Sequence, residues 1–278
     1  MKIAEFPLPF VKMSGTGNDF IIIDHRQPVI HPEAMSEFAA LVCRRKFSVG
    51  ADGLILIEES GQADFRWRFF NGDGSVAEMC GNGARCAARF AYMHGIAPAR
   101  MRFATIAGII EATVSDINVS VKMTSPKDLR LGQTITIDGE DFELHYADTG
   151  VPHAVIFVED IERTAVKELG AKVRYHKMFM PAGTNADFVG RLKNGFKVRT
   201  YERGVEDETL ACGTGATAAA LMAALTGQAE SPVSITTSGG DTLTISFDLT
   251  DGPGADNVFL KGPAHVIYRG ELTAEALL

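Results

Sequence analysis

The sequence predicts an α/β fold, in the broad sense that includes α+β proteins: two pseudo-symmetric lobes, each a curved mixed sheet wrapped around a central helix. The motif Cys-Gly-x-Gly-Ala occurs at residues 80–84 and again at 212–216, and each copy opens an alanine-rich segment. Thr105 and Thr237 stand at the same distance beyond the two motifs, so an offset of 132 residues extends past both segments. Such a repeat indicates two copies of one domain. Each half also combines many strand-like runs with two helical segments, one so apolar that it is expected to be buried.

The first half begins with a glycine-rich loop that leads into a buried strand, because glycines at this density before a β-branched run are typical of turns. Residues 31–45 carry apolar side chains at helical spacing after an acidic first turn, which predicts a surface helix. The alanine-rich segment at 84–94 predicts a second helix, with Cys80 at or just before its N-terminus. Strands are expected at residues 20–23, 54–57, 64–70, 100–105, 109–114 and 117–123.

The second half follows the same plan. A peripheral helix is expected at residues 160–169 and a buried helix at 216–225, just after Cys212. Strands are expected at residues 134–137, 142–147, 154–158, 196–201, 233–237, 242–247, 259–261 and 264–268. Pro126 and its polar neighbours mark the boundary between the halves. We expect an N-terminal lobe of residues 1–124, completed by a strand at 266–278, and a C-terminal lobe of residues 125–265.

The composition restricts the possible functions. Hydrophobic residues make up 46% and charged residues 22% of the 278, which are ordinary values for a soluble globular protein. The net charge of −8 disfavours a nucleic-acid partner, since binding to phosphates requires an excess of Lys and Arg. The sequence shows no signal peptide and no apolar run approaching the roughly 18 residues of a membrane span. We expect a cytoplasmic protein with a small-molecule substrate and neither a nucleic-acid nor a membrane partner.

The four cysteines, at positions 43, 80, 86 and 212, are expected to be thiols in a reducing compartment. Cys80 and Cys86 are not spaced like the close pairs of zinc sites, and no histidine follows at finger spacing, so we expect no metal site. Cys43 and Cys86 are expected to be packing residues, because buried thiols commonly behave as small hydrophobic groups.

Cys80 and Cys212 are the candidate catalytic residues. If two copies of one domain enclose a cleft and are related by a two-fold axis, these thiols can face each other across it. Each would lie at a helix N-terminus, where unpaired amides and the helix dipole lower the pKa of a thiol. One thiolate can then remove the α-proton of a bound acid, and the opposite thiol can return a proton to the other face. Glycine-flanked amides of the two motifs could stabilise the charge that develops on the carboxylate, with neither metal nor pyridoxal.

Several segments together resemble the diaminopimelate epimerase family. They are Lys12-Met13 with Gly15-x-Gly17-Asn18-Asp19-Phe20, Phe70-Asn71-x-Asp73-Gly74-Ser75, Met79-Cys80-Gly81-Asn82-Gly83-Ala84-Arg85-Cys86, and Glu202-Arg203-Gly204 leading to Ala211-Cys212-Gly213-Thr214-Gly215-Ala216. The resemblance runs in order along the whole chain. It implies cofactor-independent interconversion of LL- and meso-2,6-diaminopimelate, in the route to lysine and peptidoglycan, by a homodimer with two α/β lobes.

The resemblance also implies roles for individual residues. Cys80 and Cys212 correspond to the two acid/base thiols. The residues implied in substrate binding are Asn18, Asn71, Gly81, Asn82, Asn185, Glu202, Arg203, Gly213 and Thr214. An arginine suits the distal carboxylate of such a substrate, and a carboxylate suits its ammonium group. His153 resembles a family histidine near the catalytic pair, where it can either tune a thiol or be a satisfied buried residue.

Three departures from the family pattern concern substrate contacts. Val151 stands where many members have asparagine, which removes a side-chain amide near the distal centre. Gly53 stands where some members have glutamine. Glu206-Asp207-Glu208 enlarges the loop before the second cysteine relative to shorter forms.

Other functions remain open from the residues alone. Proline racemases and hydroxyproline epimerases use the same two-thiol chemistry on a similar fold, but a proline ring has less use for Glu202, Arg203 and Asn185. Phenazine-biosynthesis-type isomerases share the fold and are expected to lack the paired cysteines. A non-catalytic amino-acid-binding protein, or a redox protein that forms a disulfide between Cys80 and Cys212, belongs to another class.

Overall fold

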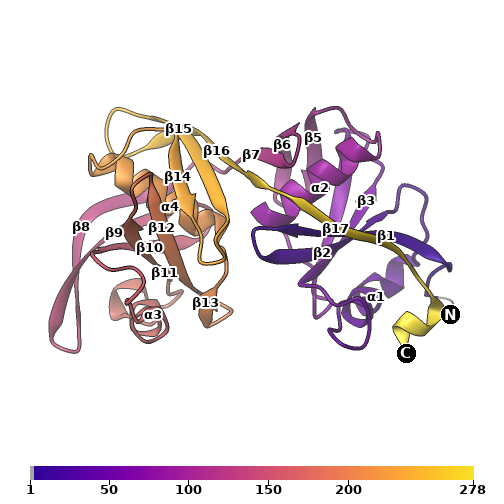
Figure 1. Cartoon of the computed structure of the whole chain (residues 1–278), viewed down its shortest axis with the longest axis horizontal. Helices are drawn as coiled ribbons and strands as arrows, with labels where there is room; N and C mark the ends of the chain where they lie inside the picture. Colours follow the sequence, from indigo (N-terminus) through magenta and orange to yellow (C-terminus); the bar gives the residue numbers. More distant parts are fainter. Residues whose placement is uncertain (1–2) are drawn as a thin grey trace. The chain divides into compact units, whose positions relative to one another are not determined.

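The structure is a computed structural model that describes residues 3–278, and its internal contacts divide the chain into two compact units. Unit 1 comprises the chain up to Val121 together with Pro263–Leu278, and unit 2 is Lys122–Gly262. The C-terminal segment thus returns to the unit that contains the beginning of the chain, as the yellow strand beside the indigo ones shows in Figure 1. Within residues 3–278, no helix is long and apolar enough to cross a membrane.

Unit 1 is one mixed sheet with two α-helices. Its strands are β1 (Leu8–Gly15), β2 (Asn18–Asp24), β3 (Gly53–Glu58), β4 (Phe65–Asn71), β5 (Arg100–Thr105), β6 (Gly108–Ser115), β7 (Asn118–Lys122) and β17 (His265–Leu272). The helices are α1 (Met35–Val42), preceded by a 3-10 turn at Pro32–Ala34, and α2 (Gly81–Met93), and a 3-10 turn at Ala274–Leu277 follows β17. In the order β17-β1-β2-β3-β4-β5-β6-β7, the pairings are antiparallel, antiparallel, parallel, antiparallel, parallel, antiparallel and antiparallel.

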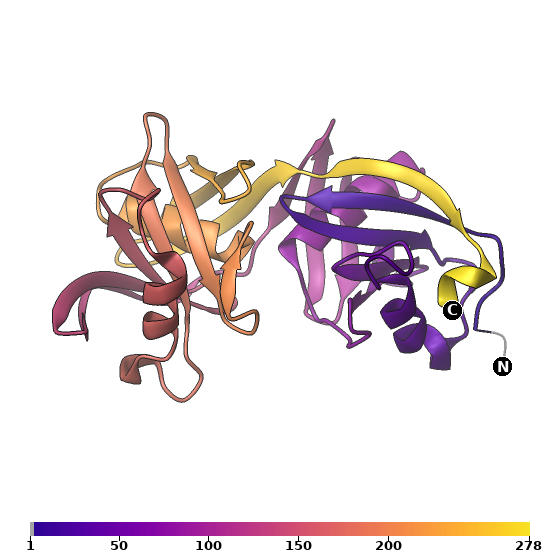
Figure 2. The ribbon, with the colours of Figure 1, turned by 60° about the horizontal axis from the view of Figure 1, so that its bottom comes forward.

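Unit 2 repeats this arrangement. Its strands are β8 (Lys127–Ile137), β9 (Glu140–Asp148), β10 (Pro152–Val158), β11 (Asn185–Arg191), β12 (Phe196–Glu202), β13 (Asp207–Thr209), β14 (Val233–Thr236), β15 (Thr242–Leu249) and β16 (Ala255–Pro263). The helices are α3 (Val166–Arg174), with a 3-10 turn at Lys177–Phe179, and α4 (Gly213–Leu225). The order β8-β9-β10-β11-β12-β14-β15-β16 has the same succession of antiparallel and parallel pairings as unit 1. Strand β17 therefore occupies in unit 1 the place that β8 has in unit 2; Figure 2 shows β17 running alongside β1.

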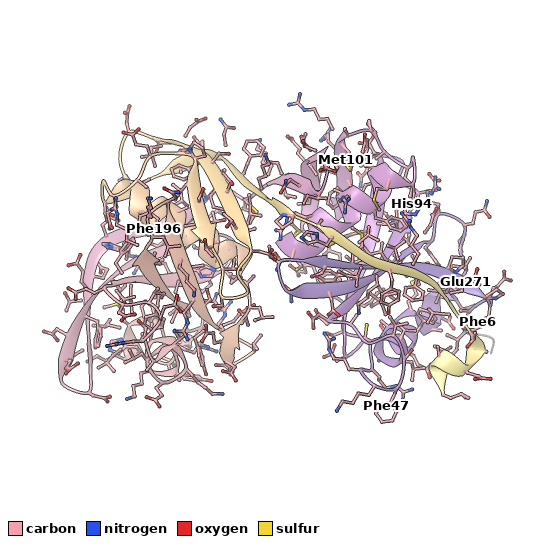
Figure 3. All side chains as sticks on the ribbon, in the orientation of Figure 1. Phe6, Phe47, His94, Met101, Phe196 and Glu271 are labelled. Atoms are coloured by element: carbon pink, nitrogen blue, oxygen red, sulfur yellow. The ribbon has the colours of Figure 1, made fainter. Side chains whose placement is uncertain are left out.

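Each sheet curves around its alanine-rich helix. Helix α2 contacts β1, β2, β3 and β6, strands from well-separated positions of its sheet, and α4 contacts β9 to β12, β14 and β15. Small alanine side chains let the backbone of a helix approach a sheet closely, so helix and strands bury their apolar faces together. Met101 in unit 1 and Phe196 in unit 2, each 2% exposed, mark the two cores (Figure 3). The predicted fold class is confirmed.

Two local predictions were wrong. Residues before Asn18 were expected to form a loop, but Leu8–Gly15 is strand β1, joined to β2 by a two-residue turn in which Thr16 and Gly17 have φ values of 55° and 95°. Positive φ at both central residues is the geometry of the tightest hairpins. The helix expected at 160–169 begins only at Val166. The carboxylate of Asp160 accepts the backbone N–H groups of Glu162 and Arg163, which favours a turn over a helix there.

Candidate functional site

Cys80 is the N-cap of helix α2. Its backbone is extended, with φ −150° and ψ 119°, and its half-buried Sγ lies 3.5 Å from the backbone nitrogen of Gly83, which donates to it. A side chain at this position commonly accepts one of the unpaired amides of the first helical turn. The motif therefore places a sulfur atom where the positive end of the helix dipole favours negative charge.

Asn18 and Asn82 join Cys80 in one group. Asn82, in the first turn of α2, donates from Nδ2 to Oδ1 of Asn18 at 2.6 Å. Nδ2 of Asn18 in turn donates to Asp52 at 3.1 Å. Unit 1 thus brings three of the predicted site residues together, from the β1–β2 hairpin and from the start of α2.

Asn71 ends strand β4 opposite Gly53 and is exposed. Its Nδ2 donates to Oγ of Ser75 at 2.9 Å, which holds the side chain within the turn that follows the strand. The departure at Gly53 has a local cause: an added Cβ would lie 2.6 Å from Cε2 of Phe69 and 2.7 Å from the carbonyl oxygen of Phe70. A larger residue cannot be accommodated there without displacing the neighbouring strand.

Arg85 was not predicted as a site residue, although it directly follows the first motif. It is fully buried, and its Nη2 donates to Oγ1 of Thr16 at 2.7 Å and to Oδ1 of Asn82 at 2.9 Å. Its Nε donates to the carbonyl oxygen of Pro263 at 3.4 Å. A buried guanidinium is stable only with several partners of this kind, and these contacts tie the first turn of α2 to the hairpin turn that precedes Asn18.

Cys212 is the equivalent N-cap of α4, with φ −122° and ψ 110°. The backbone nitrogen of Gly215 donates to its Sγ at 3.4 Å, and Oγ1 of Thr214 lies 3.3 Å from the same atom. At 8% exposure, Cys212 is more buried than Cys80. Both motifs therefore form the same thiol-capped helix start, once in each unit.

The expected lowering of the thiol pKa is wrong for Cys212. Burial raises its pKa strongly, and the negative charges of Glu202 and Asp187 act in the same direction. The hydroxyl of Thr214 and the amide of Gly215 lower the pKa, but by less than burial raises it. Cys212 is therefore a neutral thiol at neutral pH in this structure, the form that donates a proton.

Asn185, Glu202 and Arg203 lie together at the ends of strands β11 and β12. Oδ1 of Asn185 accepts the backbone N–H of Arg203 at 2.7 Å, and its Nδ2 donates to the carbonyl oxygen of Pro152 at 2.9 Å. His153 follows Pro152 and is fully buried; its Nδ1 lies 2.7 Å from Oδ2 of Asp187. Unit 2 thus brings these predicted residues together, and His153 pairs with a carboxylate, Asp187, that was not predicted.

Replacement of Glu202 by glutamine is expected to stabilise the free protein. Burial raises the pKa of the Glu202 carboxyl above its ordinary value. A raised pKa means that the folded chain binds this proton more tightly than the unfolded chain, so its contribution to stability falls as pH rises from the ordinary value through the raised one. The Glu202→Gln variant should therefore have a higher melting temperature than the parent at pH 7, and the difference should shrink toward pH 4. Thermal unfolding at both pH values measures this, and a lower melting temperature at pH 7 would contradict it.

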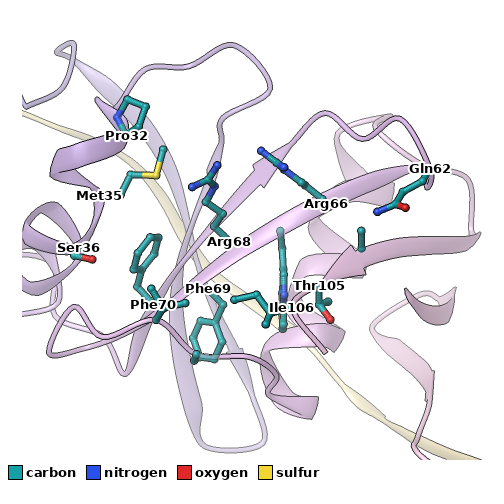
Figure 4. Close-up of a pocket in the computed structure, with 14 residues that line it drawn as sticks. Pro32, Met35, Ser36, Gln62, Arg66, Arg68, Phe69, Phe70, Thr105 and Ile106 are labelled. Atoms are coloured by element: carbon teal, nitrogen blue, oxygen red, sulfur yellow. The ribbon is translucent and has the colours of Figure 1, made fainter. Parts of the chain in front are cut away.

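One pocket of about 460 Å³ lies in unit 1, bordered by α1, β4 and β5 (Figure 4). Arg66 and Arg68 stand on its rim, and Met35 and Phe70 contribute apolar walls. The Nε atoms of both arginines are engaged by Glu58, at 2.7 and 3.0 Å. None of the predicted site residues lines this pocket, so the candidate site is defined by the helix starts of α2 and α4 instead.

Comparison with known proteins gives a consistent result. A family model described as diaminopimelate epimerase matches residues 10–129 and 145–266. A protein named diaminopimelate epimerase from Aquifex aeolicus is 45% identical over 283 residues, covering 97% of this chain and 99% of its own length. The protein of that name from Archaeoglobus fulgidus is 41% identical, with coverages of 97% and 98%.

Solved structures with the same fold are more distant in sequence. A PhzF-family phenazine biosynthesis protein from Bacillus anthracis has a TM-score of 0.73 at 15% identity, covering 96% of this chain and 99% of its own. A hydroxyproline epimerase from Agrobacterium vitis has a TM-score of 0.67 at 13% identity, with coverages of 98% and 94%. At these identities the likeness concerns the fold alone.

Proposed function

Because this chain belongs to the diaminopimelate epimerase family, we propose that it interconverts LL- and meso-2,6-diaminopimelate in lysine biosynthesis by proton transfer between two thiols. The observation that carries the proposal is the pair of equivalent helix starts, in which Cys80 and Cys212 each cap an alanine-rich helix and accept one of its amides. Cys43 and Cys86, the other two free cysteines, are buried and cap no helix N-terminus. The pKa of each is raised to about 12, mainly by burial.

The proposed reaction needs one thiolate and one thiol. The thiolate takes the α-proton, so that the C–H bond breaks, an S–H bond forms, and the electron pair passes into the carboxylate as an enediolate. The opposite thiol then gives its proton to the other face of the α-carbon and is left as the thiolate. Cys212, a neutral thiol in this structure, is in the state of the donor. The scheme requires both sulfur atoms on opposite sides of one substrate carbon, and neither metal nor pyridoxal takes part.

Backbone amides are the proposed stabilisers of the enediolate. Gly81 and Asn82 begin α2, and Gly213 and Thr214 begin α4, so their N–H groups belong to the unpaired first turns. Donors fixed in advance at a developing negative charge usually provide the largest single contribution to such catalysis. Glycine at positions 81 and 213 leaves these amides accessible to a carboxylate.

The distal amino acid centre of the substrate has matching groups in the same set of residues. We propose that Arg203 binds its carboxylate and Glu202 its ammonium group, with amide contacts from Asn18, Asn71 and Asn185. His153, predicted as a residue that can tune a thiol, is proposed to act on the distal site instead, through Asn185, whose Nδ2 lies 3.5 Å from its Nε2. Val151 contributes no amide, so we expect fewer contacts to the distal centre than in members with asparagine.

We propose that units 1 and 2 are the two catalytic lobes and that the enzyme is a cytoplasmic homodimer. Four free cysteines support a reducing compartment, where thiol catalysis needs no protection from disulfide formation. Sedimentation of the pure protein across a range of concentrations tests the dimer, because a monomer of 29.9 kDa at all concentrations would contradict it.

Heavy water tests the reaction. The metal-free protein, kept reduced, is incubated in D2O with meso-diaminopimelate and, separately, with L-proline, and proton NMR follows loss of the α-proton signal. We expect deuterium at one stereocentre of diaminopimelate, formation of the LL isomer, and no change in proline. Exchange with proline alone would instead support a proline racemase. The absence of exchange with both substrates would support a binding or redox protein.

A further inference from the structure

The two copies of the repeat differ in one coherent set of positions beneath the helix starts. In unit 2, strand pairing places His153 opposite Asn185, and Asp187 opposite Thr200. The equivalent pairs in unit 1 are Phe20 opposite Gly53, and Ile55 opposite Phe69. The same site in the fold is therefore apolar beneath the Cys80 helix and polar beneath the Cys212 helix.

The polar set is buried and internally bonded. His153 and Asp187 are 0% exposed. Oδ1 of Asp187 accepts the hydroxyl of Thr200 at 2.7 Å, and Oδ2 lies 2.7 Å from Nδ1 of His153. The carboxylate therefore has a donor on each oxygen, as a buried charge requires.

The partners determine which ring nitrogen of His153 carries a proton. A carboxylate can only accept, so Nδ1 of His153 is the donor. The amide of Asn185 is oriented by an obligatory donor, the N–H of Arg203, and by an obligatory acceptor, the carbonyl of Pro152. Its Nδ2 consequently faces Nε2 of His153 at 3.5 Å. A donor at that position favours a lone pair on Nε2, which defines one tautomer and one orientation of the ring.

Asp187 also contacts the helix that carries the second thiol. A Cβ added to Gly215 would lie 2.4 Å from Oδ1 of Asp187 and 3.1 Å from Oγ1 of Thr200. The carboxylate thus occupies space directly against the first turn of α4, and only glycine leaves room for it. In unit 1, the equivalent space at Gly83 is filled by Cδ1 of Ile55 at 3.3 Å.

Packing alone does not account for the carboxylate. Unit 1 fills the same place with apolar side chains, which cost nothing to bury, whereas a buried charge must recover its lost hydration from its partners. The contacts of Asp187 instead lead, through His153 and Asn185, to the backbone of Arg203. They connect the start of α4 with the residues proposed to hold the distal centre.

We propose that Asp187 is a positioning residue, which fixes the ring of His153 and, through it, the amide of Asn185 and the Arg203 turn for binding of the distal amino acid centre. This inference rests on the proposed function for the identity of the substrate. In this proposal, His153 acts on the distal centre by orienting the amide of Asn185. The apolar set of unit 1 has no equivalent of this chain of hydrogen bonds.

The test compares Asp187→Asn with the parent enzyme. An asparagine side chain has one acceptor oxygen, so only one of the two donors, the Thr200 hydroxyl or Nδ1–H of His153, keeps its acceptor, and neither bond is then assisted by a negative charge. We expect the KM for diaminopimelate to rise about 10- to 100-fold, the loss expected for one charged buried hydrogen bond, with a smaller change in kcat. In 15N-histidine-labelled protein, the Nδ1–H signal of His153 should shift or disappear in the variant.

Two further variants keep the test decisive. Thr200→Val removes one donor to Asp187 and should also raise KM, by a smaller factor. This variant tests the proposal even if Asp187→Asn does not fold. Ile55→Val, at the position equivalent to Asp187 in unit 1, is the matched control: it should lower the melting temperature and leave KM unchanged.

The possible results separate the two proposals. Unchanged KM and an unchanged His153 signal in folded Asp187→Asn would overturn the positioning role, as would variants that differ from the parent in melting temperature only. If the parent enzyme shows no exchange with diaminopimelate, the proposed function fails. The histidine signal then still decides whether Asp187 controls the tautomer of His153.

Discussion

Cys80→Ala and Cys212→Ala are each expected to lower epimerisation of diaminopimelate by at least about 10² to 10⁴-fold, the usual contribution of a general acid or base. Each variant removes one of the two groups that the reaction needs, and no second thiol caps the same helix. Formation of the meso isomer from the LL isomer, followed at pH 7.5 under reducing conditions, measures the loss. Turnover retained in either variant would refute the two-thiol assignment.

Cys43→Ala is the matched control for the cysteine variants. Cys43 is a buried thiol at the C-terminal end of α1, and its pKa is raised to about 12, mainly by burial. Its replacement removes one buried sulfur and should cost about 1 kcal/mol of stability without affecting turnover. A large loss of activity in this variant would show that thiol removal disturbs the fold in general, and the cysteine results would then need another explanation.

Gly215→Ala is expected to lower both stability and activity strongly. Alanine is normally favoured over glycine inside a helix by about 1 kcal/mol. Here its Cβ would lie 2.4 Å from Oδ1 of Asp187, so either the carboxylate or the first turn of α4 must move. We expect a loss of about 1 to 3 kcal/mol, as for overpacked cores, and a fall in kcat/KM of about 10²-fold, since a displacement of about 1 Å at a site can have that effect.

Gly83→Ala tests the same helix position in unit 1. Its Cβ would meet Cδ1 of Ile55 at 3.3 Å and the ring of Phe20 at 3.5 Å, and the end of an isoleucine side chain can shift by a few tenths of an ångström. Both variants keep the amide that donates to the thiol, so they differ only in what the added carbon contacts. Thermal and denaturant unfolding should show Gly83→Ala near the parent and Gly215→Ala well below it. Equal losses would contradict the account of Asp187.

Much of the site follows from local sequence. A cysteine followed by Gly-x-Gly and an alanine-rich run predicts a helix that begins at or just after the cysteine, because helix formation depends on residues within one or two turns. The repeat then relates Cys80 to Cys212 without knowledge of the fold. Both helices begin directly after their cysteines, as predicted, and the structure adds that each thiol caps its helix.

The contacts that complete each half of the site were not predictable in this way. Asn18 meets Asn82 across 64 positions of sequence, and Asp187 meets His153 across 34. Such contacts depend on the registers of the β1–β2 hairpin and of the parallel β10–β11 pair, which a single sequence does not specify. An aspartate in the middle of strand β11, where the equivalent strand β3 of unit 1 has isoleucine, was the available signal for this carboxylate.

The sequence by itself determined that the chain repeats one design and that each copy begins its buried helix at a cysteine, because periodicity, capping and glycine turns are properties of neighbouring residues. Only the tertiary structure decided how the two copies differ. Burial and charges from distant strands raise the pKa of Cys212, and a polar set beneath α4 replaces the apolar one beneath α2. Electrostatic energy depends on distance in space and on exclusion of water, and both are set when strands far apart in the chain pack against a helix.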